Sequence, residues 1–386
     1  MMVLFTNKRD CYGCGACASV CPRGAIKMVH DKHGFLYPVI DPEKCIDCHL
    51  CNRVCQIGNE VDLLTQYPKA TYAVKNEDEI RSRSSSGGAF TALSDSILNS
   101  GGLIVGAAYD ESMCVRHRVA GEVASRDSMR GSKYVQSDIS NVFNEYKNLS
   151  GKKVLFTGTP CQIAAFKLLV AKLLKVNSSN WVYADLVCHG APSPTVWGDY
   201  VRSLEKKQGS RLVSYSFRNK DAGWRGYHIR AEFEDGSVLL DDSSEARGFA
   251  VVFSKSLGLR PSCYHCPYSR MQRVGDLTIA DYWGIEKDDP EFSDNVGVSM
   301  VFVNSEQGGT LLTDSSERLA LKEETETPVQ RNLHNSTDYP QFDYDSFWTA
   351  YENGSWGGVA SRFGYVGKSG KLYRLVDKVK TKVRRA

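Results

Sequence analysis

The hydrophobic and polar positions between residues 70 and 305 follow two alternating periods. Short apolar runs rich in β-branched residues are typical of buried strands, and they occur as "GLIVGAAY", "KKVLFTG", "NWVYADLV", "RLVSYSF" and "GVSMVFV". Stretches with one apolar helical face separate some of them, namely "GGAFTALSDSILNS", "CQIAAFKLLVAKLL" and "PTVWGDYVRSLEKK". This alternation predicts an α/β domain in which helices flank a sheet.

The two ends of the chain differ from this central part. Near the N-terminus, "AIKMVHDKHGFLYPVID" alternates and turns at Asp31 to Gly34, which predicts a β-hairpin. Near the C-terminus, "QFDYDSFWTAYENGSWGG" is compatible with a short helix that closes the fold. We therefore expect a small domain at residues 1–60, an α/β domain at residues 70–305 and a C-terminal extension at residues 306–386, a fold that is α+β overall.

Two cysteine-rich runs fall inside the small N-terminal domain. Both have the spacing C-x2-C-x2-C-x3-C, and their members are Cys11, Cys14, Cys17 and Cys21, then Cys45, Cys48, Cys51 and Cys55. A disulfide framework is expected in short secreted chains behind a signal peptide, whereas this chain has 386 residues and opens with "MMVLFTNKRD", which has no apolar core. Structural zinc usually takes two C-x2-C pairs that are separated by a longer loop. The repeated spacing instead indicates two 4Fe-4S clusters.

The ligands of the two clusters are expected to cross between the runs. In two-cluster ferredoxins the fourth cysteine of each run binds the other cluster. One ligand set is then Cys11, Cys14, Cys17 and Cys55, and the other is Cys45, Cys48, Cys51 and Cys21. Residues 1–60 thus resemble a bacterial-type ferredoxin domain, with one departure: Gln56 stands where the first run has Pro22.

Composition and charge add little to this picture. The chain is 42% hydrophobic and 24% charged, and 48 basic and 45 acidic side chains leave a net charge of +3. These values indicate a globular protein and give no reason to expect binding to nucleic acid or to a membrane surface. No run reaches about 18 apolar residues, so we expect no membrane span and a cytoplasmic location. The C-terminal "KVKTKVRRA" is a solvated tail or, alternatively, a docking patch for an acidic partner such as a ferredoxin.

Two turns of the α/β domain have the composition of phosphate-binding loops. "RSRSSSGGAF" places serines and glycines before a predicted helix, and "VLFTGTPCQIAAF" leads from a strand through Thr-Gly-Thr-Pro into another. Ordinary helix capping would use the same residue types. In a protein that handles electrons, the pair of turns favours a flavin phosphate or pyrophosphate.

Four later cysteines suggest a further metal site. Cys161 and Cys188 follow predicted strands at the edge where open α/β sheets place their sites. Cys263 and Cys266 form a C-x2-C pair that would complete a set of four thiolates. Zinc binding and buried, inert thiols are the alternatives. The helix that begins near Cys161 should lower the pKa of its thiol.

The central part of the chain also resembles a known family. "GSKYVQSD", "VLFTGTPCQIAAFK", "DLVCHGAPSP", "RPSCYHCPYSR" and "GDLTIADYWGI" occur in the order seen in the coenzyme F420 hydrogenase/dehydrogenase beta subunit family. That family includes 7-hydroxymethyl chlorophyll a reductase and the flavin half of F420-dependent sulfite reductase. The resemblance implies a flavin, FAD or alternatively FMN, and a third 4Fe-4S cluster whose ligands are Cys161, Cys188, Cys263 and Cys266.

The same resemblance implies the residues that contact the flavin. They are Ser85, Ser86, Gly87, Gly88, Lys133, Tyr134, Thr157, Gly158, Thr159 and Gln162. Lys133 beside a phosphate or the N1/O2 edge of the ring would stabilise the reduced flavin. Asp281 and Trp283 line the ring's site or end a strand, and His189 and His265 are candidate neighbours of the third cluster.

These observations predict an iron–sulfur flavoprotein oxidoreductase. Electrons would pass between a ferredoxin or another one-electron donor, the clusters and the flavin, and the flavin would act on a small-molecule substrate or a deazaflavin. The alternative is a non-catalytic electron-transfer subunit that serves a partner redox subunit in a larger complex. No residue is assigned a catalytic role beyond cofactor binding.

Overall fold

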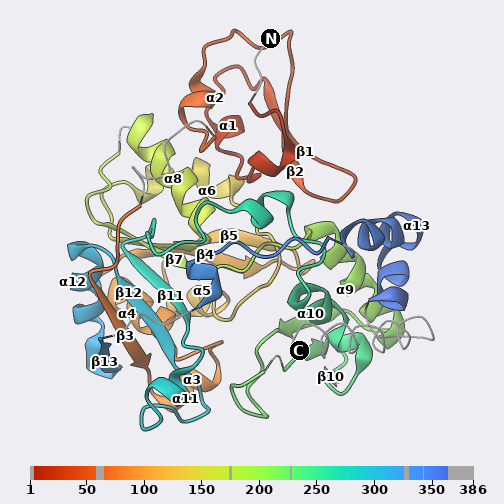
Figure 1. Ribbon diagram of the computed structural model, residues 1–386. Helices are drawn as coiled ribbons and strands as arrows, with labels where there is room; N and C mark the ends of the chain where they lie inside the picture. The colour runs from red at the N-terminus through yellow and green to blue at the C-terminus, as the bar shows by residue number, and fades with distance from the viewer. Residues whose placement is uncertain are drawn as a thin grey trace.

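The computed structural model describes residues 4–57, 65–173, 176–226, 228–325, 330–341 and 343–363. The basic run at residues 378–386 lies outside them. Within the described residues the N-terminal domain sits at one end of the molecule, above a large mixed sheet, as Figure 1 shows. The N-terminal domain contains η1 (Lys8–Asp10), α1 (Ala16–Ser19), β1 (Ile26–His30), β2 (Leu36–Ile40) and α2 (Leu50–Arg53).

The hairpin expected in this domain is present, and it reaches the rest of the protein. β1 and β2 pair in antiparallel register from Ile26 opposite Ile40 to His30 opposite Leu36. At the turn, the Oδ1 atom of Asp31 accepts hydrogen bonds from the backbone N–H groups of His33 and Phe35, each at 3.0 Å. Gly34 has φ +80°, and a Cβ atom there would lie 2.2 Å from Oγ1 of Thr195. The turn is therefore packed tightly against the helix that contains Thr195, α9 (Pro194–Gln208).

The large sheet has eight strands in the order β13-β3-β12-β11-β7-β6-β4-β5. Its central strands β11, β7, β6 and β4 are parallel, and the remaining pairs are antiparallel. The bounds are β3 (Ala70–Lys75), β4 (Leu103–Tyr109), β5 (Val115–Ala120), β6 (Val154–Gly158), β7 (Trp181–Leu186), β11 (Leu277–Asp281), β12 (Ser299–Val303) and β13 (Ala320–Glu324).

Helices cover both faces of this sheet, as the alternation of apolar runs predicts. Side chains alternate across a strand, so Phe156 of β6 packs with Phe166 of α8 in one cluster, while Leu155 packs with Leu93 of α4 in the other. The flanking elements are α3 (Asp78–Ser82), α4 (Ala89–Asn99), α5 (Val123–Asp127), α6 (Ser140–Asn144), α7 (Tyr146–Leu149), α8 (Pro160–Lys172), α11 (Ile285–Asp288) and α12 (Glu306–Asp314), with η4 (Ser316–Arg318) after α12. The mixed α/β fold with a helix-flanked sheet is confirmed.

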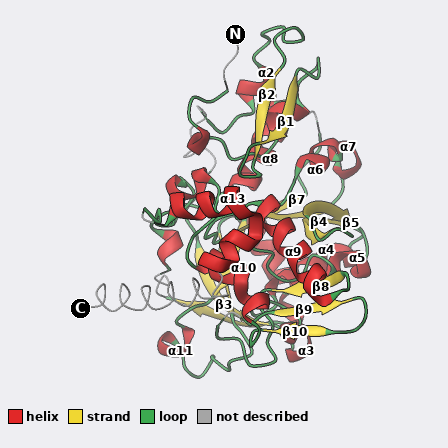
Figure 2. Cartoon of the chain, turned by 90° about the vertical axis from the view of Figure 1, so that its right-hand side faces the viewer, coloured by secondary structure: helices red, strands yellow, loops and turns green. Residues whose placement is uncertain are grey.

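A second, three-stranded sheet was not expected as a separate unit. Its antiparallel strands are β8 (Leu212–Ser216), β9 (Arg230–Phe233) and β10 (Val238–Leu240). The predicted strand "RLVSYSF" forms, but it joins this sheet because its buried side chains Leu212, Tyr215 and Phe217 pack in the same aromatic cluster as Trp197 and Phe249. Figure 2 shows the small sheet at the end of the molecule away from the N-terminal domain.

The remaining elements pack around this aromatic cluster and the N-terminal domain. Besides α9, they are α10 (Ser244–Ser254), η3 (Pro261–His265), η5 (Arg331–Leu333) and α13 (Tyr344–Arg362). α13 occupies the segment expected to be a short helix, but it has 19 residues and a kink at Gly354 and Ser355, whose backbone angles are not helical. No helix of the described segments is both long and apolar enough to cross a membrane.

Candidate redox site

Two cavities in the N-terminal domain are each lined by four cysteines. The outer cavity has Cys21, Cys45, Cys48 and Cys51 on its wall, with an empty volume of about 360 Å³ that includes the part open to solvent. The inner cavity has Cys11, Cys14, Cys17 and Cys55, with an empty volume of about 390 Å³ that likewise includes its open part. The structure thus groups the cysteines as crossing between the two runs requires.

The inner cavity is the more buried of the two. Cys11 and Cys17 are 8% exposed, whereas Cys48 of the outer cavity is an exposed residue. Burial raises the pKa of the Cys14 thiol to about 12, and it also raises the pKa of Cys17 and of Cys55, to which neighbouring cysteines add. Thiols this hard to ionise become ligands only when metal ions supply the compensating positive charge.

The donor set suits a cluster better than a single ion. Among the described residues, no three histidine, cysteine, aspartate or glutamate side chains converge on one point that would hold a metal ion. A cubane differs because each thiolate binds a different iron, so its four cysteines are spread around a cavity. The two cysteine-lined cavities have this arrangement.

The four later cysteines also lie together in the structure. Cys161 is in the first turn of α8, Cys188 follows β7, Cys263 is in η3 and Cys266 is its C-terminal cap. The pKa of Cys188 is raised well above its ordinary value, first by burial and then by the charges of Cys263, Cys161 and Cys266. The other three cysteines therefore lie within electrostatic range of Cys188. Their assignment as ligands of a third cluster stays a prediction.

The expectation about Cys161 itself is wrong in one respect. The N-terminus of a helix should lower the pKa of its thiol, but burial raises that pKa to about 12, and the charge of Cys266 adds to the rise. Desolvation outweighs the helix dipole because Cys161 is enclosed by the domain interface. The hydroxyl of Thr159, 3.2 Å from Sγ of Cys161, is the main local group that favours the thiolate.

Tyr12 lies between the inner cavity and the four later cysteines. It lines the inner cavity, and its ring meets the ring of Tyr268 at a centroid distance of 6.0 Å. The charges of Cys266, Cys161 and Cys55 all raise the pKa of its hydroxyl, after burial as the largest cause. The charge of Cys14 also contributes to the raised pKa of Cys161. The two groups of cysteines are therefore neighbours across the interface of the two domains.

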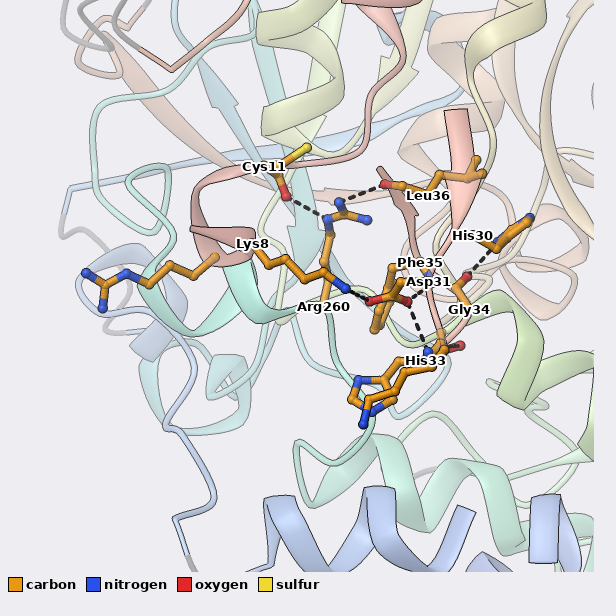
Figure 3. Close-up of polar contacts among 12 residues, drawn as sticks. Lys8, Cys11, His30, Asp31, His33, Gly34, Phe35, Leu36 and Arg260 are labelled. Carbon is orange, nitrogen blue, oxygen red and sulfur yellow. Dashed lines mark hydrogen bonds and ion pairs between the residues drawn. The ribbon is translucent and has the colours of Figure 1, made fainter. Parts of the chain in front are cut away.

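Arg260 joins the same two groups through its backbone and its side chain. Its carbonyl oxygen accepts a hydrogen bond from the N–H group of Cys263 at 2.9 Å. Its guanidinium donates to the carbonyl oxygens of Cys11 at 2.8 Å and Leu36 at 2.9 Å, as Figure 3 shows. Gly13 has φ +66°, which favours glycine, and a Cβ atom there would lie 2.5 Å from this guanidinium and force it to shift.

A buried ion pair fixes the loops that carry Cys188 and Cys266. Arg273 and Asp185 are 1% and 0% exposed, and Nη2 of Arg273 lies 3.0 Å from Oδ1 of Asp185. The other carboxylate oxygen accepts hydrogen bonds from the backbone N–H groups of Val274 and Gly275, both at 2.9 Å. Asp185 stands near the end of β7, three residues before Cys188, and Arg273 follows Cys266, so this pair holds both cysteine loops at one edge of the sheet.

The predicted flavin loops meet at the carboxyl ends of the same strands. The backbone N–H group of Ser132 donates to Oγ of Ser85 at 2.7 Å, which joins the serine loop to the segment that contains Lys133 and Tyr134. Gly88 caps α4 in the left-handed region with φ +83°, and no side chain caps that helix. Gly87 serves packing rather than ligand approach, because a Cβ atom there would lie 2.2 Å from the carbonyl oxygen of Val74. Ser86 is likewise engaged, since its hydroxyl donates to the carbonyl oxygen of Val298 at 2.7 Å.

Lys133 is held by backbone oxygens instead of a carboxylate. Its Nζ atom donates to the carbonyl oxygens of Ser128, Arg130 and Gly131 at 3.0, 2.8 and 3.2 Å. Burial lowers the pKa of Lys133 to about 7. The neighbouring Arg130 has a buried Nε atom without a hydrogen-bond partner in the described structure, and burial lowers its pKa. A cation with an unfilled donor beside an uncapped helix fits an anionic group such as a phosphate.

Other predicted flavin contacts are already engaged within the protein. Thr159 and Gln162 form a capping box at the start of α8. Oγ1 of Thr157 donates to the carbonyl oxygen of Val105 at 3.0 Å, and the ring of Tyr134 stacks on Phe253 at 4.3 Å. Ordinary capping and packing therefore account for these contacts. Gly158 ends β6, and a Cβ atom there would lie 3.3 Å from Nε2 of His117.

The residues of less definite role have partners of their own. Asp281 ends β11 and is half-buried; burial raises its pKa although Nη1 of Arg218 lies 3.3 Å from its Oδ2. Trp283 stacks on Trp224 at 5.0 Å and is 40% exposed. Nε2 of His189 forms a hydrogen bond with the hydroxyl of Ser256 at 3.0 Å, and His265 is exposed at the end of η3.

Three interface residues were missed by the sequence analysis. Arg260 and Tyr268 stand inside the motif "RPSCYHCPYSR", next to the cysteines that attracted attention, and Gln56 was noted only as a departure from proline. All three residues are polar or aromatic and lie within three positions of a cysteine, and this proximity is the feature of the sequence that could have identified them.

Comparison with known proteins agrees with this geometry. Residues 10–59 match the 4Fe-4S dicluster domain, and residues 151–328 match the C-terminal part of the coenzyme F420 hydrogenase/dehydrogenase beta subunit. The chain thus carries a 4Fe-4S dicluster domain followed by a segment similar to the C-terminal part of the F420 hydrogenase/dehydrogenase beta subunit. An uncharacterised ferredoxin of Methanocaldococcus jannaschii is 31% identical over 74 residues, which are 19% of this chain and 94% of that protein.

One solved structure is similar to part of this beta-subunit-like protein. It is a chain of the F420-reducing NiFe hydrogenase complex from Methanosarcina barkeri, with 17% sequence identity and a TM-score of 0.46. The match covers 67% of this chain and 83% of that chain. The two matched segments and their cysteines identify this protein as an iron–sulfur electron-transfer protein related to the F420 hydrogenase beta subunit.

Proposed function

We propose that this protein is an iron–sulfur flavoprotein oxidoreductase that moves electrons between a one-electron carrier and a flavin. The observation that carries the proposal is the position of Tyr12, which lines the inner cavity and lies within electrostatic range of Cys161 and Cys266. This proximity supports the proposal that the two cysteine groups would be consecutive steps of one electron path. The exposed Cys48 of the outer cavity supports entry of electrons at that end.

Three groups of cysteines would hold the clusters. Cys21, Cys45, Cys48 and Cys51 would hold the outer one, and Cys11, Cys14, Cys17 and Cys55 the inner one. Cys161, Cys188, Cys263 and Cys266 would hold a third, beside the carboxyl edge of the sheet. A 4Fe-4S cluster exchanges single electrons, and a flavin converts them into two-electron chemistry on a substrate.

The flavin, as FAD or FMN, would lie where the serine loop and the Lys133 segment meet. The uncapped N-terminus of α4, Arg130 and Lys133 would bind its phosphate, a role that the unfilled Nε donor of Arg130 supports while its Nη2 atom pairs with Asp127 at 2.9 Å. Lys133 would give up part of its bonding to the carbonyl oxygens of Ser128, Arg130 and Gly131 when an anion approaches. The substrate would be a small molecule or a deazaflavin at the exposed side of the ring.

The decisive experiment is anaerobic purification followed by identification of the released flavin and a screen of electron donors. Reduced ferredoxin, reduced F420 and NAD(P)H are mixed with the protein in turn, and flavin bleaching is followed by absorbance. Flavin present in stoichiometric amount and reduced by at least one of these donors is the expected result. Protein that carries clusters but no flavin would contradict the proposal, and flavin reduction without turnover of any added acceptor would favour a non-catalytic electron-transfer subunit.

A further inference from the structure

Gln56 places an unsatisfied amide group at the wall of the inner cavity. It follows Cys55 directly and lines the same cavity as Cys11, Cys14 and Cys17. The side chain is 5% exposed. Its Oε1 atom accepts a hydrogen bond from the hydroxyl of Tyr268 at 2.6 Å, which leaves Nε2 as the other end of the amide. That Nε2 atom is buried and has no hydrogen-bond partner in the described structure.

The outer cavity has no such donor at the equivalent position. Pro22 follows Cys21 as Gln56 follows Cys55, and it lines the outer cavity. Proline has neither a side-chain donor nor a backbone N–H group. A buried N–H group that lacks a partner lowers the stability of the folded protein. Glutamine in place of proline therefore has a cost that the described residues of the protein do not compensate.

We infer that Nε2 of Gln56 donates a hydrogen bond to a sulfur atom of the cluster in the inner cavity, and that Tyr268 holds the amide in this orientation. Hydrogen bonds to the sulfurs are among the factors that set the reduction potential of an iron–sulfur cluster. The donor stabilises the reduced form, which has gained one electron and is more negative. The inner cluster is thereby easier to reduce than it would be beside an apolar residue.

Tyr268 makes this effect depend on the docking of the two domains. It belongs to the segment after Cys266, is 1% exposed, and its ring contacts the ring of Tyr12. Gln56 then presents its amide to the inner cavity only when the core domain is in place. Tyr268 is a positioning residue.

The test is a redox titration of the two N-terminal clusters in anaerobically prepared full-length protein. EPR spectroscopy measures the reduced clusters at each potential. In Gln56→Met, which keeps the size of the side chain and removes the donor, one midpoint potential is expected to move to a more negative value while the other stays. Gln56→Glu should move the same potential further, because a carboxylate adds negative charge. Repeating Gln56→Met in a Cys48→Ser background, which removes the outer cluster, identifies the shifted signal as that of the inner one.

Two further variants make the result specific. Tyr268→Phe should shift the same potential in the same direction by a smaller amount, since Gln56 remains but is no longer held. Gln272→Met is the matched control, because its amide reaches the hydroxyl of Tyr67 at the surface and should leave both potentials unchanged. Iron analysis accompanies each measurement.

Unchanged potentials in Gln56→Met with full iron content would overturn the inference, and so would equal shifts of both clusters. If Gln56→Met does not retain its inner cluster, Tyr268→Phe decides in the same way. The inference rests on the proposed function only for the clusters of the N-terminal domain. Absence of flavin would sink the proposed function and leave these two potentials measurable.

Discussion

The guanidinium of Arg260 donates a hydrogen bond to the carbonyl oxygen of Cys11 at 2.8 Å, although 249 positions of sequence separate the two residues. Arg260 also stands three residues before Cys263, whose N–H group bonds its carbonyl oxygen. One residue therefore sets the distance between a ligand of the N-terminal domain and a candidate ligand of the core. Arg260 is thus one of the residues that hold the two cysteine groups in place relative to each other.

Replacing Arg260 by alanine should loosen the docking of the N-terminal domain. The carbonyl oxygens of Cys11 and Leu36 would lose a charged donor, and such a loss costs about 1–3 kcal/mol for each buried group. We expect a lower free energy of unfolding in urea, together with slower reduction of the flavin by reduced ferredoxin in stopped-flow measurements. Arg9→Ala, at an exposed position of η1, is the control and should change neither. A fully stable and fast Arg260→Ala protein would show that this contact is dispensable.

The two N-terminal cavities should lose their clusters independently. Cys14→Ser removes a ligand of the inner cavity and Cys48→Ser one of the outer cavity, and each is expected to lower the iron content by about four atoms per chain. The flavin should stay bound in both variants, because the loops proposed to hold it belong to the core domain. Iron analysis and the absorbance spectrum of the released flavin give the answer. Loss of flavin from folded Cys14→Ser protein would mean that the N-terminal domain helps to hold the flavin.

Acidification should destabilise the protein through His117. Burial lowers the pKa of this histidine to about 4. In the buried site its Nδ1 atom contacts the hydroxyl of Ser137 and its Nε2 atom contacts the carbonyl oxygen of Thr157. The unfolded chain, with an ordinary pKa near 6.5, binds the extra proton between these values, so the stability contribution is complete above about pH 6.5 and declines toward pH 4. The full contribution is about 3 kcal/mol.

Urea unfolding at pH 7.5 and pH 5.5 measures this effect, and wild-type protein should lose about 1 kcal/mol more than His117→Gln over that interval. His334→Gln, at an exposed position, should keep the wild-type dependence. Equal pH dependence in wild type and His117→Gln would mean that another group carries the acid sensitivity.

Local patterns predicted the helices and strands of the large sheet well for a physical reason. The spacing C-x2-C-x2-C-x3-C limits which thiols can reach one cavity. The apolar runs at residues 102–109 and 180–187 bury their side chains as the strands β4 and β7. The placement of "RLVSYSF" in a separate sheet was not predictable, because it depends on packing against Trp197 of α9 and Phe249 of α10, which the pattern of the strand itself does not show.

The contacts between the domains were beyond the sequence for the same reason. Nothing local in Arg260 shows that it reaches Cys11, and the role of Gln56 appears only when Tyr268 is placed beside it. The pKa of Cys161 illustrates the reverse error: the helix N-terminus was visible in the sequence, but the burial that outweighs it arises from packing between the domains.

The central claim is a continuous path from the outer cavity to the core, and iron content tests it most directly. Anaerobically reconstituted protein should contain about twelve irons per chain, whereas a two-cluster arrangement would contain about eight. A Cys263→Ser/Cys266→Ser variant should lose about four irons, keep both N-terminal clusters and no longer reduce its flavin with ferredoxin. An iron content near eight in fully reconstituted wild-type protein, with zinc or free thiols at Cys161, Cys188, Cys263 and Cys266, would contradict the account.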